Sequence, residues 1–402
     1  MSPTIASTVY GSRLTRVPNT VKTISVPERK TISVPERTTK RPAHTPYILV
    51  CVIGNPEFAI DEKVPPAELC TFHFYSLEQK PPPFENAQQK GWKWILSLAQ
   101  THADVSRYGL DISEKQVDLW NTKLSDHSNR NEVSQYKASG ILSHAIFDTT
   151  LTCRRTDDDI TNIIRLLQDL HAIPPSSAQV SGANLGELMI GIHSWSSALR
   201  SCGHSVRDHF HRLVRELNPY AVLFRSTYRE ALSYCAAPCN PSCTLAGLSA
   251  WNDTDLKQQP SMVEALSFKQ SVTLPPNVLG MLSLSPRLML MKTKGCKNCT
   301  WKDVNEVEEA LRGCLESNSL RPAEFICGGR QHYSDFFSHR FQVLKDESRI
   351  QELASVYQPS KFLSTIIVYD TNETMAKKVF TAKTFKTVRK NYVLICVFVV
   401  KP

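Results

Sequence analysis

Three acidic residues stand at the ends of apolar segments whose length and composition are typical of β-strands. Asp111 ends "YGLDI", Asp148 follows "GILSHAIF" and Asp370 follows "FLSTIIVY". A carboxylate at a strand end could exchange protons with a bound molecule or contact it directly. No Glu follows Asp148 within residues 149–153, so the segment lacks an acid–base pair. For Asp111 and Asp148 the alternative is a purely structural role in the turn after the strand.

Residues with ring side chains stand at the same kind of position. His193 and Trp195 fall at the end of "ELMIGIHSW", and Tyr369 ends the apolar segment before Asp370. The flat face of an aromatic ring can stack on a bound molecule, so these residues are candidate ligand contacts. Packing in the protein core is the alternative for each of them. A further group of histidines lies on predicted helices, where we expect solvent exposure and no metal site: His171, His204, His209 and His211.

The chain contains 12 cysteines, a number that raises the question of metal binding. Cys235, Cys239 and Cys243 are spaced by three residues, which fits neither zinc nor iron–sulfur patterns. Cys296 and Cys299 have a zinc-like spacing but no second pair nearby. We therefore predict disulfides and no metal site, with a connectivity that the sequence does not settle.

Three Asn-x-Ser/Thr sequons, at Asn252, Asn298 and Asn372, are candidate glycosylation sites. Together with the cysteines they favour an oxidising environment, so we expect an extracellular or cell-surface protein. The first residues contain no apolar stretch of the kind that a signal peptide needs. An intracellular protein with reduced cysteines is the alternative.

The net charge of +9 is concentrated near the two ends of the sequence. Residues 1–43 carry +6 and residues 376–402 carry +7, so the residues between them carry −4. Charge placed in this way gives no groove for specific binding of nucleic acid. The longest apolar run, residues 393–400, is too short to span a membrane, and no cofactor-binding motif is found.

The pattern of composition divides the sequence into three parts. Residues 1–46 are rich in Pro, Ser, Thr and basic residues and contain a tandem octamer repeat at 23–38, so we predict a disordered linker. Residues 47–380 have the alternating apolar segments of a folded domain. Residues 381–402 form a basic and apolar tail.

Predicted strands and helices alternate along residues 47–380. The strands cover residues 47–54, 70–77, 108–112, 140–147, 187–195, 220–226, 277–284, 323–329 and 362–370. The helices cover residues 86–102, 113–124, 157–171, 205–217, 301–315 and 347–357, with Ser113 as a predicted N-cap. Strands that are apolar on both faces suit a parallel sheet covered by helices. We therefore predict an α/β fold, a single-domain (β/α)₈ barrel, with an open doubly wound sheet as the alternative.

Several of these segments resemble the arthropod chitinase-like proteins related to glycoside hydrolase family 18. The similar segments, from residue 47 to residue 379, are "LVCVIG", "VPPAELCTFHFYS", "YGLDI", "GILSHAIFDT" and "FLSTIIVYDTN". The resemblance implies a (β/α)₈ barrel, a secreted or cell-surface setting and a disulfide between Cys51 and Cys70. Active members of that family carry Asp-x-x-Asp-x-Asp-x-Glu at the fourth strand, where the Glu protonates the leaving oxygen.

This sequence lacks that catalytic motif, although Asp148 stands at the matching strand. We therefore expect a chitinase-like barrel without hydrolase activity, which binds a glycan or a protein partner. The alternative is an active glycoside hydrolase that acts on N-acetylglucosamine polymers with relocated carboxylates.

Overall fold

The computed structural model describes residues between 48 and 396, with several gaps. The described residues are 48–53, 67, 70–77, 90–176, 186–194, 196–226, 251, 261–284, 287–294, 314–322, 342–347, 350–358, 363–384 and 394–396. The predicted linker at 1–46, the predicted strand at 323–329 and most of the predicted helix at 301–315 lie outside them.

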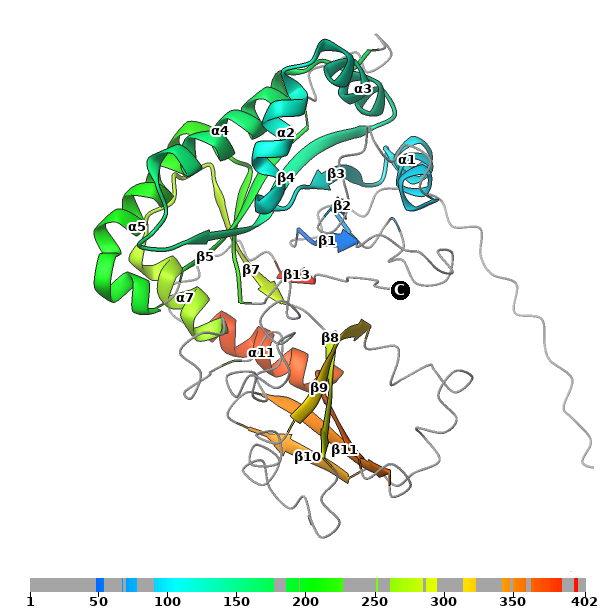
Figure 1. Ribbon diagram of the computed structural model, residues 1–402, viewed down its shortest axis with the longest axis vertical. Helices are drawn as coiled ribbons and strands as arrows, with labels where there is room; N and C mark the ends of the chain where they lie inside the picture. The colour runs from blue at the N-terminus through cyan, green and yellow to red at the C-terminus, as the bar shows by residue number, and fades with distance from the viewer. Residues whose placement is uncertain are drawn as a thin grey trace, which may run out of the picture. The chain divides into compact units, whose positions relative to one another are not determined.

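A parallel sheet of eight strands dominates the structure (Figure 1). Its strands are β1 (Val50–Ile53), β2 (Phe72–Ser76), β3 (Arg107–Asp111), β4 (Ile141–Leu151), β5 (Leu188–Ser194), β6 (Ala221–Phe224), β7 (Leu279–Leu284) and β13 (Leu394–Cys396). Each of β1 to β7 pairs in parallel with the next in the sequence, and β13 pairs with β7. This order is the one expected of a (β/α)₈ barrel.

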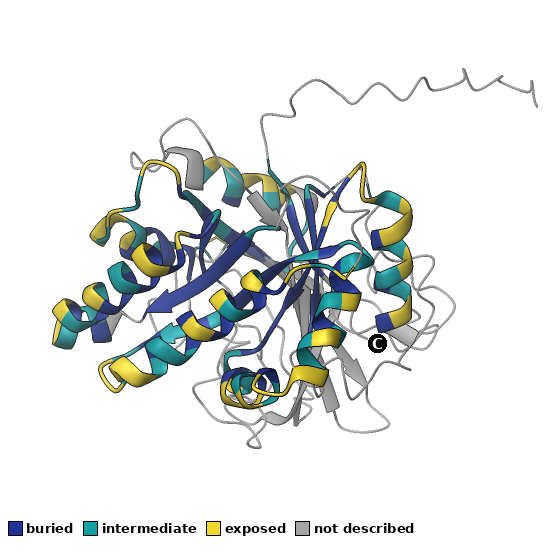
Figure 2. Cartoon of the chain, turned by 90° about the horizontal axis from the view of Figure 1, so that it is seen from above, coloured by how far each residue is buried: buried dark blue, intermediate teal, exposed yellow. Residues whose placement is uncertain are grey.

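Helices connect the parallel strands and cover one face of the sheet. They are α1 (Lys90–His102), the 3₁₀ helix η3 (Glu114–Gln116), α2 (Val117–Leu124), α3 (His127–Ala138), α4 (Asp157–Ala172), α5 (Ser196–Leu217) and α7 (Met262–Ser271). Figure 2 shows buried strands beside helices that are exposed only on their outer side. The predicted α/β class is confirmed by this arrangement.

The two faces of the parallel sheet belong to two separate apolar cores. The outer-face core joins strand residues such as Leu110 and Ile190 to apolar side chains of the covering helices. The inner-face core consists almost entirely of strand residues, including Phe74, Ala145 and Phe147. A sheet with an apolar core on its helix-free face must curl around that core, because otherwise these side chains would be exposed to water.

The curled sheet brings its two edge strands together. β1 and β13 contact each other, but the described residues show no backbone hydrogen-bond ladder between them. The sheet is therefore a partly closed barrel, and the strand order agrees with the predicted (β/α)₈ architecture.

A second sheet, of five antiparallel strands, is formed by residues between β7 and β13. Its order is β10 (Gln342–Asp346), β11 (Gln351–Gln358), β12 (Leu363–Tyr369), β8 (Arg287–Lys294) and β9 (Cys314–Pro322). The helix α11 (Asn372–Thr384) follows β12. This sheet was not predicted from the sequence.

Two predictions for this region are wrong. Residues 347–357 were predicted as a helix, but Gln351–Gln358 forms β11, because pairing with β12 outweighs the local helix propensity. Residues 362–370 were predicted as the last parallel strand, but Leu363–Tyr369 pairs antiparallel with both of its neighbours. The eighth parallel strand comes instead from residues 394–396, within the segment predicted as a tail.

Among the described residues, two disulfides link elements of the parallel sheet and its helices. Cys51 in β1 is bonded to Cys70 just before β2, which confirms the pairing that the family resemblance implies. Cys153, which follows β4, is bonded to Cys202 in α5, and their Cα atoms are 5.6 Å apart. The backbone of α5 is non-helical at Cys202, so the second disulfide is attached at an interruption of that helix.

Candidate functional site at the strand ends

Polar residues occupy the inner face of the parallel sheet at the carboxyl ends of its strands. Side chains alternate between the two faces of a strand, so the residues that follow the inner-face core can be assigned to that face. This strand-end set consists of Ser76, Asp111, His193, Arg225 and Ser283, and all five residues are buried. In parallel α/β barrels ligands bind at this end of the strands, so the strand-end set is the candidate site.

Asp111 is fully buried at the end of β3. Its Oδ1 accepts a hydrogen bond of 3.1 Å from the backbone N–H of Phe147. The register of β4 with β5 is shifted between Ile146 and Thr149, the part of β4 that contains Phe147. Asp111 thus contributes to holding the irregular part of β4 in place, and one of its oxygens is committed to the backbone.

Asp148 organises the turn that follows β3. Its Oδ2 accepts a hydrogen bond from the Ser113 hydroxyl, its Oδ1 accepts one from the Glu114 N–H, and both are 2.7 Å long. Glu114 in turn accepts from the Thr150 N–H and forms an ion pair with Arg155. Ser113 is the N-cap residue of η3, as predicted, but its side chain makes no capping bond to the helix, because its hydroxyl donates to Asp148.

His193 lies at the end of β5, beside Arg225 at the end of β6. Burial, and next the nearby charge of Arg225, lower the pKa of His193 to about 3, although a hydrogen bond with the Arg225 backbone opposes the shift. The imidazole is therefore neutral near pH 7. Trp195, the aromatic candidate next to this position, lies outside the described residues.

Tyr369 and Asp370, the remaining candidates, belong to the end of β12 in the antiparallel sheet. The carboxylate of Asp370 accepts hydrogen bonds of 2.6 and 2.7 Å from the buried ammonium of Lys378. Its Oδ1 also accepts from the Thr374 hydroxyl. Asp370 therefore joins the end of β12 to α11, and the two candidates come from a different sheet than the strand-end set.

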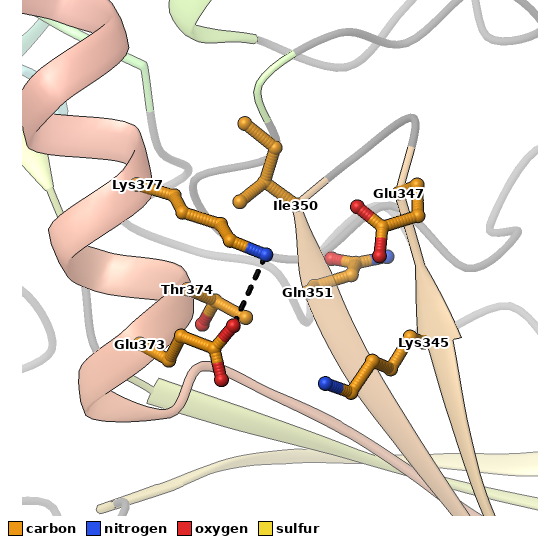
Figure 3. Close-up of a pocket in the computed structure, with 7 residues that line it drawn as sticks. All are labelled: Lys345, Glu347, Ile350, Gln351, Glu373, Thr374 and Lys377. Atoms are coloured by element: carbon orange, nitrogen blue, oxygen red, sulfur yellow. Dashed lines mark ion pairs between the residues drawn. The ribbon is translucent and has the colours of Figure 1, made fainter.

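A shallow hollow lies alongside α11 (Figure 3). Lys377 and Glu373 form an ion pair of 3.1 Å at its edge. A hydrogen bond from Lys377 and the charges of Lys345 and Lys377 lower the pKa of Glu373. The hollow is lined by charges of both signs, so its chemistry does not favour one class of ligand.

None of the three β4 residues that can be assigned to the inner face of the sheet is a carboxylate. Ala145 and Phe147 belong to the inner-face core, and the Phe147 ring packs edge-on against Phe74 at 5.1 Å. Thr150 is paired with His193 of β5, which belongs to the inner face. A general acid must lie within hydrogen-bond reach of the bond that is cleaved, and these three side chains cannot supply one.

The predictions that the chain has no metal site and no membrane span can be compared with the structure only for the described residues. Among them, no three His, Cys, Asp or Glu side chains are grouped as metal ligands would be. Within the same part of the chain, no helix combines the length and the apolar character needed to cross a bilayer. Of the sequons, Asn372 begins α11, while Asn252 and Asn298 lie outside the described residues.

The sequence reasoning missed Arg225 and the Cys153–Cys202 disulfide. Arg225 could have been found, because it follows the apolar strand "YAVLF" and alternation assigns it to the inner face. The disulfide had no sequence signal, because the two cysteines come from separate elements and their spacing matches no known motif.

The fold is similar to that of two solved structures, a chitinase and an N-acetylglucosaminidase. One is the Group IV chitinase of Ostrinia furnacalis, with a TM-score of 0.50 and 12% identity over 87% of this chain and 92% of that one. Another is a glycoside hydrolase family 18 N-acetylglucosaminidase from Paenibacillus barengoltzii, with a TM-score of 0.51 and 11% identity over 88% and 95% of the chains. No protein-family model and no curated protein sequence matches the chain. The similarity is therefore one of fold.

Proposed function

We propose that this protein is a chitinase-like, glycan-binding protein without hydrolase activity. The observation that carries the proposal is the inner face of β4, where Ala145, Phe147 and Thr150 provide no proton donor. In enzymes of the family 18 type the fourth strand supplies the general acid. Loss of that acid removes catalysis but leaves the concave end of the sheet available for a ligand.

The strand-end acids do not replace the missing proton donor in this proposal. Both carboxylate oxygens of Asp148 accept hydrogen bonds of 2.7 Å, from the Ser113 hydroxyl and the Glu114 N–H, so the side chain is engaged in the turn after β3. Asp111 is committed in part to the Phe147 backbone. We assign both residues to the architecture of the site and keep His193 and Trp195 as ligand contacts.

We also propose an extracellular or cell-surface location. Two disulfides among the described residues support it, because such bonds persist in oxidising compartments. Mass spectrometry of the native protein under non-reducing conditions tests this part. Free thiols at Cys51 and Cys70 would instead favour an intracellular protein.

A combined hydrolysis and binding experiment tests the main proposal. Purified protein is incubated with N-acetylglucosamine oligomers, and we expect no shortened products by mass spectrometry. Binding of the same oligomers is measured by calorimetry for the wild type, His193→Ala and the exposed control His204→Ala. We expect weaker binding only for His193→Ala, because His204 is exposed on α5.

Two results would contradict this proposal. Hydrolysis that is lost on Asp148→Asn would favour an active glycosidase with relocated carboxylates. Absence of binding to every glycan offered, together with capture of a defined protein that depends on His193, would favour a protein ligand.

A further inference from the structure

A cluster of titratable side chains lies between the outer face of the parallel sheet and the helices, apart from the strand ends. It consists of Tyr136 and Lys137 near the end of α3, His144 in β4 and His171 in the last turn of α4. Lys137 and His144 are buried, at 1% and 0% exposure. We call these four residues the α3–α4 cluster.

Lys137 anchors the end of α4. Its ammonium donates to the carbonyl oxygens of Leu170 at 2.6 Å, Ile173 at 2.7 Å and His171 at 3.3 Å. The Leu170 and His171 carbonyls would otherwise lack partners, because the last four C=O groups of a helix have none within it. Burial lowers the pKa of Lys137 to about 8, so the ammonium is charged at neutral and acidic pH.

His144 is buried near the Lys137 ammonium, and its surroundings do not stabilise a protonated imidazole. Its Nε2 is hydrogen-bonded to the Tyr136 hydroxyl at 3.0 Å, and its Nδ1 has no hydrogen-bond partner among the described residues. A protonated imidazole would carry a buried N–H without an acceptor, next to a fixed positive charge. Burial first, and then the charges of Lys137 and His171, hold its pKa well below 6.5.

His171 adds a second titratable imidazole, which is half-buried, and its Nδ1 also has no partner within the described structure. Burial and the charge of Lys137 lower its pKa, and Glu187 partly opposes the shift. Glu187 precedes β5 and forms an ion pair of 2.8 Å with Arg107 of β3, so its carboxylate is already engaged. On the two neighbouring strands, the residues paired with His144 are Leu110 of β3 and Leu188 of β5, and neither is charged.

From this geometry we infer that the α3–α4 cluster is an acid-sensitive latch. Protonation of His144 and His171 releases the ends of α3 and α4 from the sheet, while the rest of the barrel stays folded. The latch is closed at neutral pH, where both imidazoles are neutral, and it opens as the pH falls. It does not depend on glycan binding or on hydrolysis.

The sign and size of the effect follow from linkage. A histidine that titrates near 6.5 in the open state and well below it in the closed state takes up a proton on opening. The closed latch keeps its full stability above about pH 6.5 and loses it progressively below. For His144 alone the opening constant should rise about 30-fold between pH 7.5 and pH 5.0. Lys137, with a pKa of about 8, is mostly charged over this range and adds little to the change.

Hydrogen–deuterium exchange of the full chain at pH 7.5 and 5.0 tests the inference. Exchange rates are divided by the intrinsic rates at each pH, and peptides that cover residues 131–144 and 164–176 are compared with a peptide from α2. We expect the opening constant to rise at least tenfold in the two cluster peptides and less than about threefold in the α2 peptide.

Three variants separate titration from general loosening of the structure. In Tyr136→Phe/His144→Leu both partners of the buried hydrogen bond become apolar, which costs little stability, and most of the pH response should disappear. His171→Gln, at a half-buried position that is expected to tolerate the change, should reduce the response in part. His127→Gln, at the exposed start of α3, should leave the response unchanged.

The inference is overturned if the wild-type cluster peptides respond to pH no more than the α2 peptide. It is also overturned if His171→Gln and the double variant both keep the full response. Should the double variant not fold, His171→Gln against His127→Gln still decides the question, because equal responses would exclude the cluster as the sensor.

Discussion

Removal of the Asp148 carboxylate separates a structural from a catalytic role for this residue. Its two hydrogen bonds, from Ser113 and Glu114, are 2.7 Å long and partly buried. Hydrogen bonds to a charged group contribute about 1.5–3 kcal/mol each, and partial exposure favours the lower end of that range. We therefore expect Asp148→Ala to lower the free energy of unfolding by about 3 kcal/mol.

Urea unfolding followed by tryptophan fluorescence provides the assay. If the free energy of unfolding falls by about 3 kcal/mol per M of urea, a loss of about 3 kcal/mol moves the unfolding midpoint by about 1 M. Ser113→Ala removes one of the two bonds and should move the midpoint by roughly half as much. Asp158→Ala, an exposed acid at the start of α4, is the matched control and should change stability by less than about 1 kcal/mol.

The reasoning fails if Asp148→Ala unfolds at the same urea concentration as the Asp158→Ala control. It also fails if the wild type cleaves N-acetylglucosamine oligomers and Asp148→Ala loses this activity with unchanged stability. The second result would give the carboxylate a place in catalysis rather than in the turn after β3.

Two further predictions concern the scaffold. Replacement of Cys153 and Cys202 by Ala opens a loop whose ends are 49 residues apart. In the chain-entropy model we expect the free energy of unfolding to fall by about 4 kcal/mol, measured by urea unfolding without reductant. A fall of less than about 1 kcal/mol would contradict this prediction. Gly191→Ala places a Cβ 2.5 Å from the Phe147 carbonyl oxygen and should destabilise the protein by about 2 kcal/mol. Its control, Gly203→Ala in α5, meets only the movable Arg207 side chain at 3.3 Å and should be neutral or stabilising in thermal unfolding. Equal effects of the two glycine changes would refute the close approach of β5 to β4.

The parallel half of the fold was predictable because its signals are local. The first part of β4 is a continuous apolar segment. The first turn of α4 contains three acidic residues, and one of them, Asp159, forms a capping box with Thr156. The antiparallel sheet was not predictable in the same way. The segment 351–358 has residues that suit a helix or a strand, and only its partner β12 decides between them. β13 is three residues long, which is too short for any periodic pattern.

The candidate site shows the same division. Strand ends could be located from the sequence, so Asp111, Asp148 and His193 were found. What each of them contacts depends on strand register, because the partners of Asp148 are 34 and 35 residues away along the chain. The expectation that the helical histidines are solvated is wrong for His209, which is buried, because helix exposure depends on how the helices pack.

The pairing of β7 with β13 has a consequence for how the chain folds. β7 ends at Leu284 and β13 begins at Leu394, so an entire second sheet is inserted between two neighbouring strands. The entropy lost in closing such a long loop makes this the most expensive strand pairing of the parallel sheet. The other seven strands can assemble first, which leaves the edge of β7 that later pairs with β13 without a partner strand for a time. An unpaired strand edge can recruit another chain, so aggregation during refolding should begin at β7.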